Sequence, residues 1–352
     1  MSGINESSTP EAKEAAGSVD KPVSERGAES QPAPSQSVPT GLREREYADG
    51  LSLPELSFGC FGFGTGAYGK LDDEVREALI HRAFERGIRS FDVAPVWGDS
   101  EDALKRFLGA ERLSESKIIT RAGRRFVDGD LSMSFDEASI RADLERSLER
   151  FGLSSIEVLL LHAPPPQELV KRGHALHAAR KLRDEGLVKA IVVSAPTLAH
   201  AHAAIDMGAE ILALPVNLLN SDELAAIRDE LQEKSIGLLA TSPLLHGLLA
   251  DQTSLAHRFP ERDHRSLRWS PSALRARLKH VAALRYLNDE SIRYMSVVAL
   301  RYVLAQAEVT SVCIGPRSVE QFDQLFDGRG EAPYLPPVKL ARLPQILATV
   351  GA

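Results

Sequence analysis

The sequence has few of the features that mark secreted, membrane-spanning or nucleic-acid-binding chains. Two cysteines in 352 residues are too few for a disulfide framework and favour a reducing compartment. No apolar run approaches the length that spans a bilayer, and the first residues lack the basic start and apolar core of a secretory signal. The net charge is −7 with both signs interspersed, so no basic stripe is available for nucleic acid. We therefore expect a cytoplasmic protein with neither membrane nor nucleic-acid partners.

Potential metal ligands are not grouped either. The ten histidines show no metal-ligand spacing, since His174 and His177 lie three apart without a neighbouring acidic or cysteine ligand. Cys60 and Cys313 are expected on the first and last strands, where buried and inert thiols are the common case. We therefore expect no metal site.

Two regions differ in composition. Residues 1–42 are rich in Ser, Glu, Pro, Ala and Gln and almost lack large apolar side chains, which predicts a disordered tail. A solvated extension without a role and a segment that docks on a protein partner are both open interpretations of this tail. Residues 43–352 are long enough to bury a large core and are expected to form one domain.

From about Leu51 onward, short apolar runs alternate with segments of helical periodicity. The run Ile156 to Leu161 is almost entirely apolar, as expected of a strand buried on both faces. Eight strand–helix units predict a (β/α)8 TIM barrel, an α/β fold. The expected strands are 56–62, 88–92, 117–120, 156–161, 189–193, 211–214, 237–241 and 311–314.

The helices carry their own signals. Ser134 and Glu137 have the spacing of a capping box. Residues 244–289 are too long for a simple connection and predict an insertion after the seventh strand, with a helix over about 270–287. A final helix over 338–350 should be kinked or shortened by Pro344. Further helices are expected at 75–87, 134–151, 198–207 and 222–233.

The most informative motif is Phe91-Asp92-Val93-Ala94-Pro95-Val96-Trp97-Gly98, followed by Asp99-Ser100-Glu101. It resembles the active-site signature of aldo-keto reductases, roughly F-D-T-A-x-x-Y-G with a following glutamate. Further landmarks of that family occur in order, and each follows a predicted strand, at the rim where barrel enzymes build their sites. These landmarks are the glycine-rich segment 62–66, Leu160-Leu161-His162, Ser242-Pro243-Leu244 with Gly247, and Gly315-Pro316-Arg317-Ser318.

The resemblance implies a catalytic group with two replacements. Asp92 and His162 stand where the family has its aspartate and histidine, Trp97 replaces the tyrosine, and Arg121 replaces the lysine. An indole is not a usable acid near neutral pH, whereas Arg121 stays charged and is able to stabilise an oxyanion. His162, with an ordinary pKa of about 6.5, is then the remaining proton carrier. Asp92 is expected to pair with Arg121, either in a working site or as a core ion pair.

The resemblance also implies an NADP(H) site. At the positions that contact the nicotinamide, the chain has Ala195, Ala213 and Val216, and Leu325 stands where an adenine-contacting asparagine is expected. Tyr68, after the first strand, is a candidate for the missing phenol or a packing residue. The implied cofactor-binding residues are Gly64, Thr65, Ser194, Ser242, Pro243, Leu244, Gly315, Arg317, Ser318 and Gln321.

Three functions remain open at this point. The first is an NADP(H)-linked oxidoreductase that acts on a small carbonyl, sugar or alcohol through a remodelled proton relay. The second is a catalytically inert barrel, a pseudoenzyme that binds a nucleotide or a protein partner. The third is a lyase or isomerase reaction on the same rim, with His162 as proton carrier and Arg121 as anion clamp.

Overall fold

The computed structural model describes residues 41–47, 52–172, 174–250, 253, 259–260 and 263–350. The predicted disordered tail lies outside these residues, except for its last two positions. Leu42 packs against the hydrophobic core. The carbonyl oxygen of Gly41 accepts a hydrogen bond of 2.9 Å from Arg329 Nη2.

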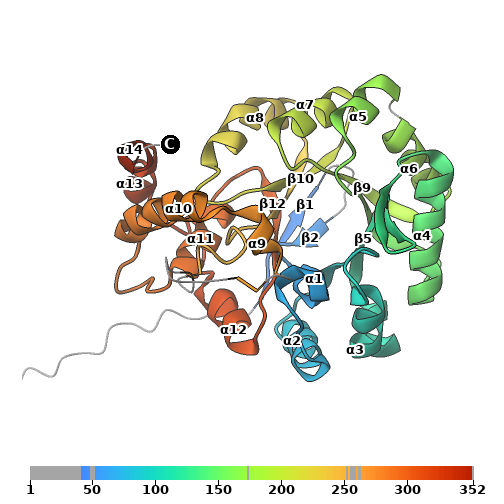
Figure 1. The fold of residues 1–352 in the computed structure, drawn as a ribbon, viewed down its shortest axis with the longest axis horizontal. Coiled ribbons are helices and arrows are strands. Elements are labelled where there is room, and N and C mark those ends of the chain that lie inside the picture. The colour runs from blue at the N-terminus through green and yellow to red at the C-terminus, as the bar shows by residue number, and fades with distance from the viewer. Residues whose placement is uncertain are drawn as a thin grey trace, which may run out of the picture. The chain divides into compact units, whose positions relative to one another are not determined.

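Eight parallel strands close into a barrel (Figure 1), which confirms the predicted (β/α)8 fold. Their spatial order follows the chain, with β12 closing on β3. Because parallel strands point the same way, all of the loops that follow them meet at one end of the barrel. The strands are β3 (Leu56–Gly59), β4 (Ser90–Asp92), β5 (Lys117–Ala122), β8 (Ile156–Leu161), β9 (Val188–Ser194), β10 (Ile211–Pro215), β11 (Gly237–Thr241) and β12 (Val309–Ile314).

Amphipathic helices surround the barrel. In the helix that follows the third strand, Ile140, Leu144, Leu148 and Phe151 are buried on one face, as their spacing predicts. The surrounding helices are α2 (Asp73–Glu85), α3 (Ser100–Ser114), α4 (Glu137–Phe151), α5 (Pro166–Arg172), α6 (His174–Asp184), α7 (Leu198–Asp206), α8 (Ser221–Glu233), α11 (Met295–Leu304) and α12 (Val319–Gly328).

Two predicted boundaries are wrong. The first strand ends at Gly59, and Cys60–Phe63 form a 3₁₀ turn, so Cys60 follows the strand instead of lying on it. Asp136, not Ser134, caps α4 by accepting a hydrogen bond of 2.8 Å from Ser139 N. A carboxylate directly before the helix is the better cap because it also interacts favourably with the helix dipole.

The predicted C-terminal helix is divided in two. The short α13 (Pro337–Leu340) is followed by α14 (Leu343–Val350). Pro344 lies in the first turn of α14, where its missing N–H has no intrahelical partner to lose. The proline therefore marks a helix start, which is the predicted shortening.

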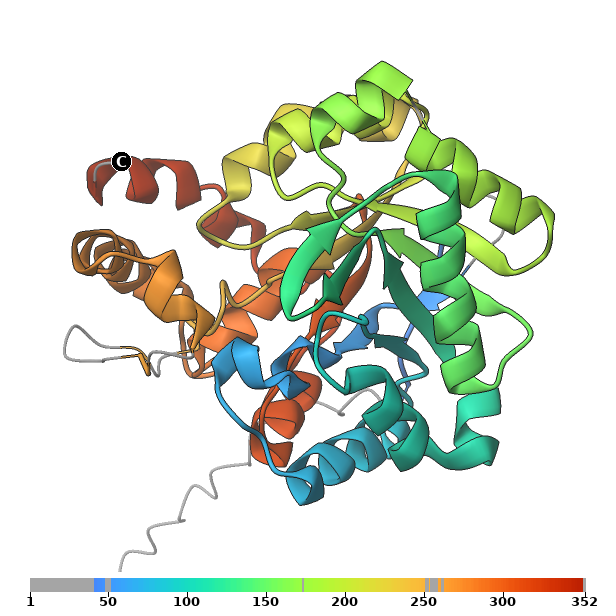
Figure 2. The ribbon, with the colours of Figure 1, turned by 45° about the vertical axis from the view of Figure 1, so that its right-hand side comes forward.

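Two excursions from the barrel lie at the carboxyl ends of the strands. The predicted insertion after β11 contains α9 (His264–Arg268), α10 (Pro271–Ala283) and the 3₁₀ helix Leu284–Leu287; the sequence predicted only the longer helix. The second excursion, which sequence reasoning missed, is the antiparallel hairpin of β6 (Arg124–Val127) and β7 (Asp130–Met133). Figure 2 shows this hairpin at the barrel rim, beside α4.

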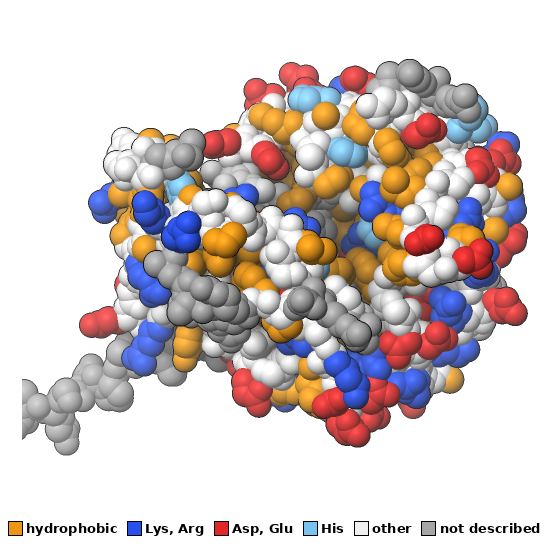
Figure 3. Space-filling model, viewed as in Figure 1, with side chains coloured by type: hydrophobic (Ala, Val, Ile, Leu, Met, Phe, Trp, Pro, Cys, Tyr) orange, Lys and Arg blue, Asp and Glu red, His pale blue; other side chains and the backbone are white. Residues whose placement is uncertain are grey.

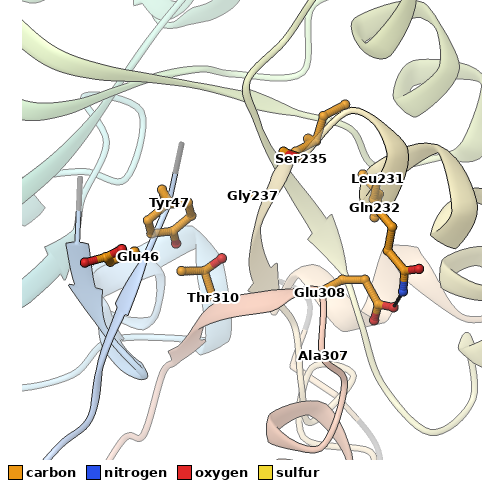
Figure 4. A pocket seen from close by; sticks show the side chains of 10 residues that line it. Glu46, Tyr47, Leu231, Gln232, Ser235, Gly237, Ala307, Glu308 and Thr310 are labelled. Carbon is orange, nitrogen blue, oxygen red and sulfur yellow. Dashed lines mark hydrogen bonds between the residues drawn. The ribbon is translucent and has the colours of Figure 1, made fainter. Parts of the chain in front are cut away.

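The other end of the barrel is closed by an N-terminal hairpin of β1 (Glu44–Glu46) and β2 (Ser52–Pro54). Tyr47 follows β1 and is 6% exposed, and its ring occupies space left by Gly237, where a Cβ would lie 2.3 Å from the ring. A pocket of about 380 Å³ opens beside it (Figure 4). Its lining includes residues at the starts of β11 and β12, so it lies at the end of the barrel opposite the predicted site residues. It is lined by Glu46, Tyr47, Leu231, Gln232, Ser235, Ile236, Gly237, Ala307, Glu308 and Thr310.

The hydroxyl of Tyr47 generates a stability prediction. It is buried without a hydrogen-bond partner among the described residues, and burial raises the pKa of this phenol far above its ordinary value. Tyr47→Phe keeps the ring and removes the unsatisfied group, so we expect the free energy of unfolding to rise by about 1 kcal/mol. Tyr47→Ala should lower it by about 3–5 kcal/mol. Urea denaturation of both variants checks this, and a Phe variant less stable than the parent would contradict it.

Candidate active site

The predicted catalytic residues meet at the carboxyl end of the barrel. Asp92 ends β4, and Arg121 lies near the end of β5. Arg121 donates two hydrogen bonds to the Asp92 carboxylate, Nε to Oδ1 at 3.0 Å and Nη2 to Oδ2 at 2.7 Å. The side chains are 9% and 3% exposed, so the expected buried ion pair is present. For Arg121 Nη1, no hydrogen-bond partner lies among the described residues.

Trp97 lies against this pair. The Arg121 guanidinium is centred 4.4 Å from the indole ring, a cation–π contact. The His162 ring meets the same indole edge-on, with ring centroids 6.2 Å apart. Gly64 allows this packing, because a Cβ there would lie 3.2 Å from the Trp97 carbonyl oxygen. Trp97 therefore joins the charged pair to the histidine.

His162 is buried beside two positive charges, and this environment disfavours its protonated form. Burial and the positive charges of Arg121 and Arg124 lower the pKa of His162 to about 2. Its Nδ1 is buried without a hydrogen-bond partner among the described residues. The pKa of His162 therefore lies well below the intrinsic value of about 6.5, and the imidazole is neutral near pH 7.

Arg124 belongs to the site, although the sequence analysis did not select it. It begins the β6–β7 hairpin and donates from Nε to the His162 carbonyl oxygen at 2.9 Å. A weaker hydrogen bond of 3.4 Å joins its Nη2 to the Ala163 carbonyl oxygen. Burial and the charge of Arg121 lower its pKa, and no carboxylate pairs with it among the described residues. The one signal in the sequence was the concentration of arginines at 121, 124 and 125.

A few polar side chains of β3, β4 and β12 lie beneath the ion pair, beside the apolar cluster that fills the rest of the barrel interior. Cys313 Sγ lies 3.5 Å from Asp92 Oδ2; burial, first, and the Asp92 charge raise the thiol pKa, as expected of an inert thiol. Deeper in the barrel, Ser57 Oγ is hydrogen-bonded to Ser90 at 3.0 Å and to Ser311 at 2.7 Å. These bonds satisfy the hydroxyls and provide a fixed base for the pair.

One side of the rim, predicted to hold the nicotinamide, is mostly apolar. Ser194 ends β9 and is partly exposed. Ala195, Ala213 and Val216 are 0%, 2% and 1% exposed. The buried Asn217 follows them, but its side chain is engaged with Leu219 N at 3.1 Å and Ser242 O at 3.4 Å. Among the positions predicted to contact the nicotinamide, only Ser194 therefore offers a carboxamide a hydroxyl.

The opposite side, predicted to hold the adenosine phosphate, is cationic. Arg317 lies at the mouth of α12, and its guanidinium donates to the carbonyl oxygens of Gly62 at 3.0 Å and Gly69 at 3.4 Å. No carboxylate pairs with it among the described residues. Ser318 caps α12 through Gln321 N, while Gln321 Oε1 accepts from Arg317 N. Cap and charge together suit an anion, although Leu325 is buried in the core.

The remaining predicted cofactor residues lie in loops along this rim. Gly64 and Thr65 open α1 (Thr65–Tyr68). Ser242 has the left-handed φ of 52°, which is uncommon for a non-glycine residue and typical of tight functional turns. Pro243, Leu244 and Gly315 occupy the turns after β11 and β12.

Tyr68 is part of a contact that spans the rim. Its ring meets His264 of the insertion, with centroids 4.8 Å apart. The guanidinium groups of Arg265 and Arg317 lie 4.8 and 5.5 Å from the Tyr68 ring. Burial raises the pKa of Tyr68 to about 12. These contacts favour the packing interpretation of Tyr68 over that of a replacement acid.

Figure 3 shows a hollow on this face, bordered by hydrophobic side chains with Lys or Arg and His side chains at its edge. In the described part of the chain, no group of three or more His, Cys, Asp and Glu side chains is placed to hold a metal ion. None of the helices described is long and apolar enough to cross a membrane.

The chain belongs to the aldo-keto reductase family, whose model matches residues 55–331. Members of this family generally use NAD(P)H. The chain is 30% identical to D-threo-aldose 1-dehydrogenase from a Pseudomonas species, over 79% of this chain and 89% of the relative. It is 27% identical to L-galactose dehydrogenase from Arabidopsis thaliana, over 78% and 84% of the two chains.

Solved structures have the same fold. The glycerol dehydrogenase from Gluconobacter oxydans superposes with a TM-score of 0.74 at 23% identity, over 88% of this chain and 96% of that one. The holo form of an aldo-keto reductase from Bacillus halodurans gives a TM-score of 0.71 at 18% identity, over 87% and 96%.

The lowered pKa of His162 predicts a pH dependence of stability. Below about pH 6.5 the unfolded chain binds a proton at this histidine that the folded chain does not bind, so stability falls as pH falls. We expect His162→Gln to reduce this slope by up to about 1.4 kcal/mol per pH unit between pH 6 and 4. Urea unfolding at several pH values measures it, with His177→Gln on the exposed face of α6 as control. Equal slopes for the parent and His162→Gln would refute the neutral, buried imidazole.

Proposed function

We propose that residues 43–352 form an oxidoreductase unit and that the tail 1–42 takes no part in its site. The unit would interconvert a small carbonyl compound and its alcohol, using a nicotinamide nucleotide and without a tyrosine acid. Relatives that are dehydrogenases and reductases of sugars and aldehydes support the reaction class. The observation that carries the proposal is the cluster of Asp92, Trp97, Arg121 and His162 at the rim, with the Arg121 Nη1 not used by the ion pair.

The nucleotide would be held mainly by its phosphates. Arg317 and the start of α12 suit a 2′-phosphate, which favours NADP(H) over NAD(H). The Ser242–Leu244 turn and the backbone of Gly64 and Thr65 would contact the nucleotide between its two ends. At the other end, Ser194 is the one hydroxyl beside an apolar wall. When bound, the nicotinamide would supply or accept the hydride.

Arg121 and Trp97 would hold the reacting oxygen. Hydride arrival at a carbonyl carbon leaves negative charge on oxygen, and a fixed guanidinium stabilises it without reorganisation. The indole N–H is able to donate a hydrogen bond but not a proton. Arg121 also keeps its own proton. The group therefore stabilises the alkoxide and leaves its protonation to another donor.

His162 would orient the oxygen, and solvent would exchange the proton. An imidazole with a pKa of about 2 is not protonated at neutral pH and is a weak base. In the direction of oxidation, the substrate hydroxyl then loses its proton to solvent base, with Arg121 lowering its pKa. Activity in this direction should rise from about pH 5 to 10 without an inflection near 6.5.

An inert nucleotide-binding barrel is the second candidate. The apolar wall of Ala195, Ala213 and Val216 favours it, because a carboxamide placed there lacks partners worth about 1–3 kcal/mol for each unsatisfied group. Turnover distinguishes the two candidates.

The Arg317 assignment is tested by direct titration with NADPH and NADH. Arg317→Ala removes a charge-assisted contact with the 2′-phosphate, so NADPH affinity should fall by about 10–100-fold while NADH affinity changes little. Titration calorimetry measures both. An equal loss of affinity for the two nucleotides would mean that Arg317 supports the loop and does not contact the 2′-phosphate. Comparing the affinity for adenosine 2′,5′-bisphosphate, which lacks the nicotinamide, with that for NADPH shows whether the nicotinamide contributes to binding.

The proton assignment is tested by turnover on a panel of aldehydes, aldoses and polyols, followed through nicotinamide absorbance. Trp97→Phe keeps the ring on the guanidinium and removes the N–H, and we expect kcat to fall by about 10²-fold. Trp97→Tyr with Arg121→Lys restores a phenol beside an ammonium, and carbonyl reduction should increase. No turnover by the parent or by this double variant, with NADPH still bound, would support the inert barrel.

A further inference from the structure

The β6–β7 hairpin has one apolar face that is open to solvent. The register pairs Phe126 with Leu131 and Arg124 with Met133, and paired residues lie on the same face of a two-stranded sheet. Phe126, Leu131 and Met133 are 58%, 53% and 53% exposed. Large apolar side chains gathered on one exposed face mark a binding surface more often than scattered ones do.

The contacts of the hairpin fix the direction of this face. Arg125, on the opposite face, hydrogen-bonds to Asp143 Oδ1 at 3.2 Å and to Ser139 Oγ at 2.8 Å, both on α4. Because successive side chains alternate, Phe126 lies on the face turned away from α4. Arg124 is on that same face and reaches the His162 carbonyl oxygen. The apolar face is therefore continuous with the site.

The charge beside this face is uncompensated. Arg121 is neutralised by Asp92, whereas Arg124 has only carbonyl partners and no carboxylate among the described residues. The Arg124 guanidinium lies at the end of β8, where it donates to the carbonyl oxygens of His162 and Ala163. An anionic group at this point would compensate a half-buried cation.

We propose that the substrate is an amphipathic anion, a carbonyl compound or alcohol with a hydrocarbon chain or ring and a carboxylate-type group. Its hydrocarbon part packs on Phe126, Leu131 and Met133, and its anionic group binds Arg124. This names the substrate class of the proposed oxidoreductase and rests on that function for the chemistry, although not for the binding.

A small ligand fits this surface better than a protein does. Stable protein interfaces bury about 1,200–2,000 Å² in total, far more than three side chains provide. A partner that covered the hairpin face would also bury the Arg124 charge. A short hydrocarbon chain with an anionic head matches both the area and the charge.

Binding of the full-length chain to straight-chain alkanoates tests the apolar face independently of turnover. Calorimetry with butanoate, hexanoate and octanoate should give affinities that rise by up to about fourfold per added methylene. Phe126→Ser with Leu131→Ser and Met133→Ser should flatten this series. Val127→Ser is the matched control, since Val127 is 47% exposed on the other face of the same hairpin and the series should persist.

The cationic contact is tested with octanoate against octanol. Arg124→Gln should lower the affinity for octanoate by about tenfold or more and leave the affinity for octanol unchanged. Three results would overturn the proposal. Affinities that still rise with chain length in the triple-serine variant would do so, as would the absence of binding by any alkanoate. A change of oligomeric state in that variant, measured by sedimentation, would also do so. Alkanoate binding without redox turnover would remove the proposed reaction and keep the ligand site, whereas turnover of neutral sugars without alkanoate binding would do the reverse.

Discussion

The buried ion pair between Asp92 and Arg121 is the interaction on which the rim depends. It joins β4 to β5 with two hydrogen bonds, and removal of either partner would leave a buried charge at a cost of about 3–5 kcal/mol. The pair also fixes the plane on which Trp97 stacks. The same guanidinium helps to lower the pKa of His162. Arg121 thus contacts one neighbour, Trp97, and contributes to the protonation state of another, His162.

This pair also determines which chemistry the rim is able to perform. A lysine ammonium is a compact charge whose pKa shifts when buried, whereas a guanidinium stays protonated and binds a carboxylate in a fixed plane. Asp92, Trp97, Arg121 and His162 include no phenol, and the pKa of the His162 imidazole lies far below neutrality. In the proposed reaction, the site would stabilise charge on a substrate oxygen and depend on solvent for protons.

Local patterns predicted the barrel because each strand and helix carries its own periodicity, as in the apolar strand β8 and the buried face of α4. The β6–β7 hairpin also had a signal that was overlooked. Asp128 and Gly129 form a two-residue turn with φ values of 52° and 91°, the geometry that favours Asp-Gly in tight hairpins. The pKa of His162 had no local signal, because it depends first on burial and then on two arginines from another strand and its hairpin.

The distribution of charge on the rim connects the proposed ligands. The chain carries a net charge of −7, but Arg317 beside α12 and Arg124 beside β5 both lack a carboxylate partner among the described residues. Between these two cations lies the neutralised pair of Asp92 and Arg121. Local positive potential on an acidic surface attracts anions selectively to one face. A nucleotide phosphate at Arg317 and a substrate anion at Arg124 would then be held apart, and the reacting carbon would lie over the neutral centre, where the Arg121 Nη1 and Trp97 are the nearest donors.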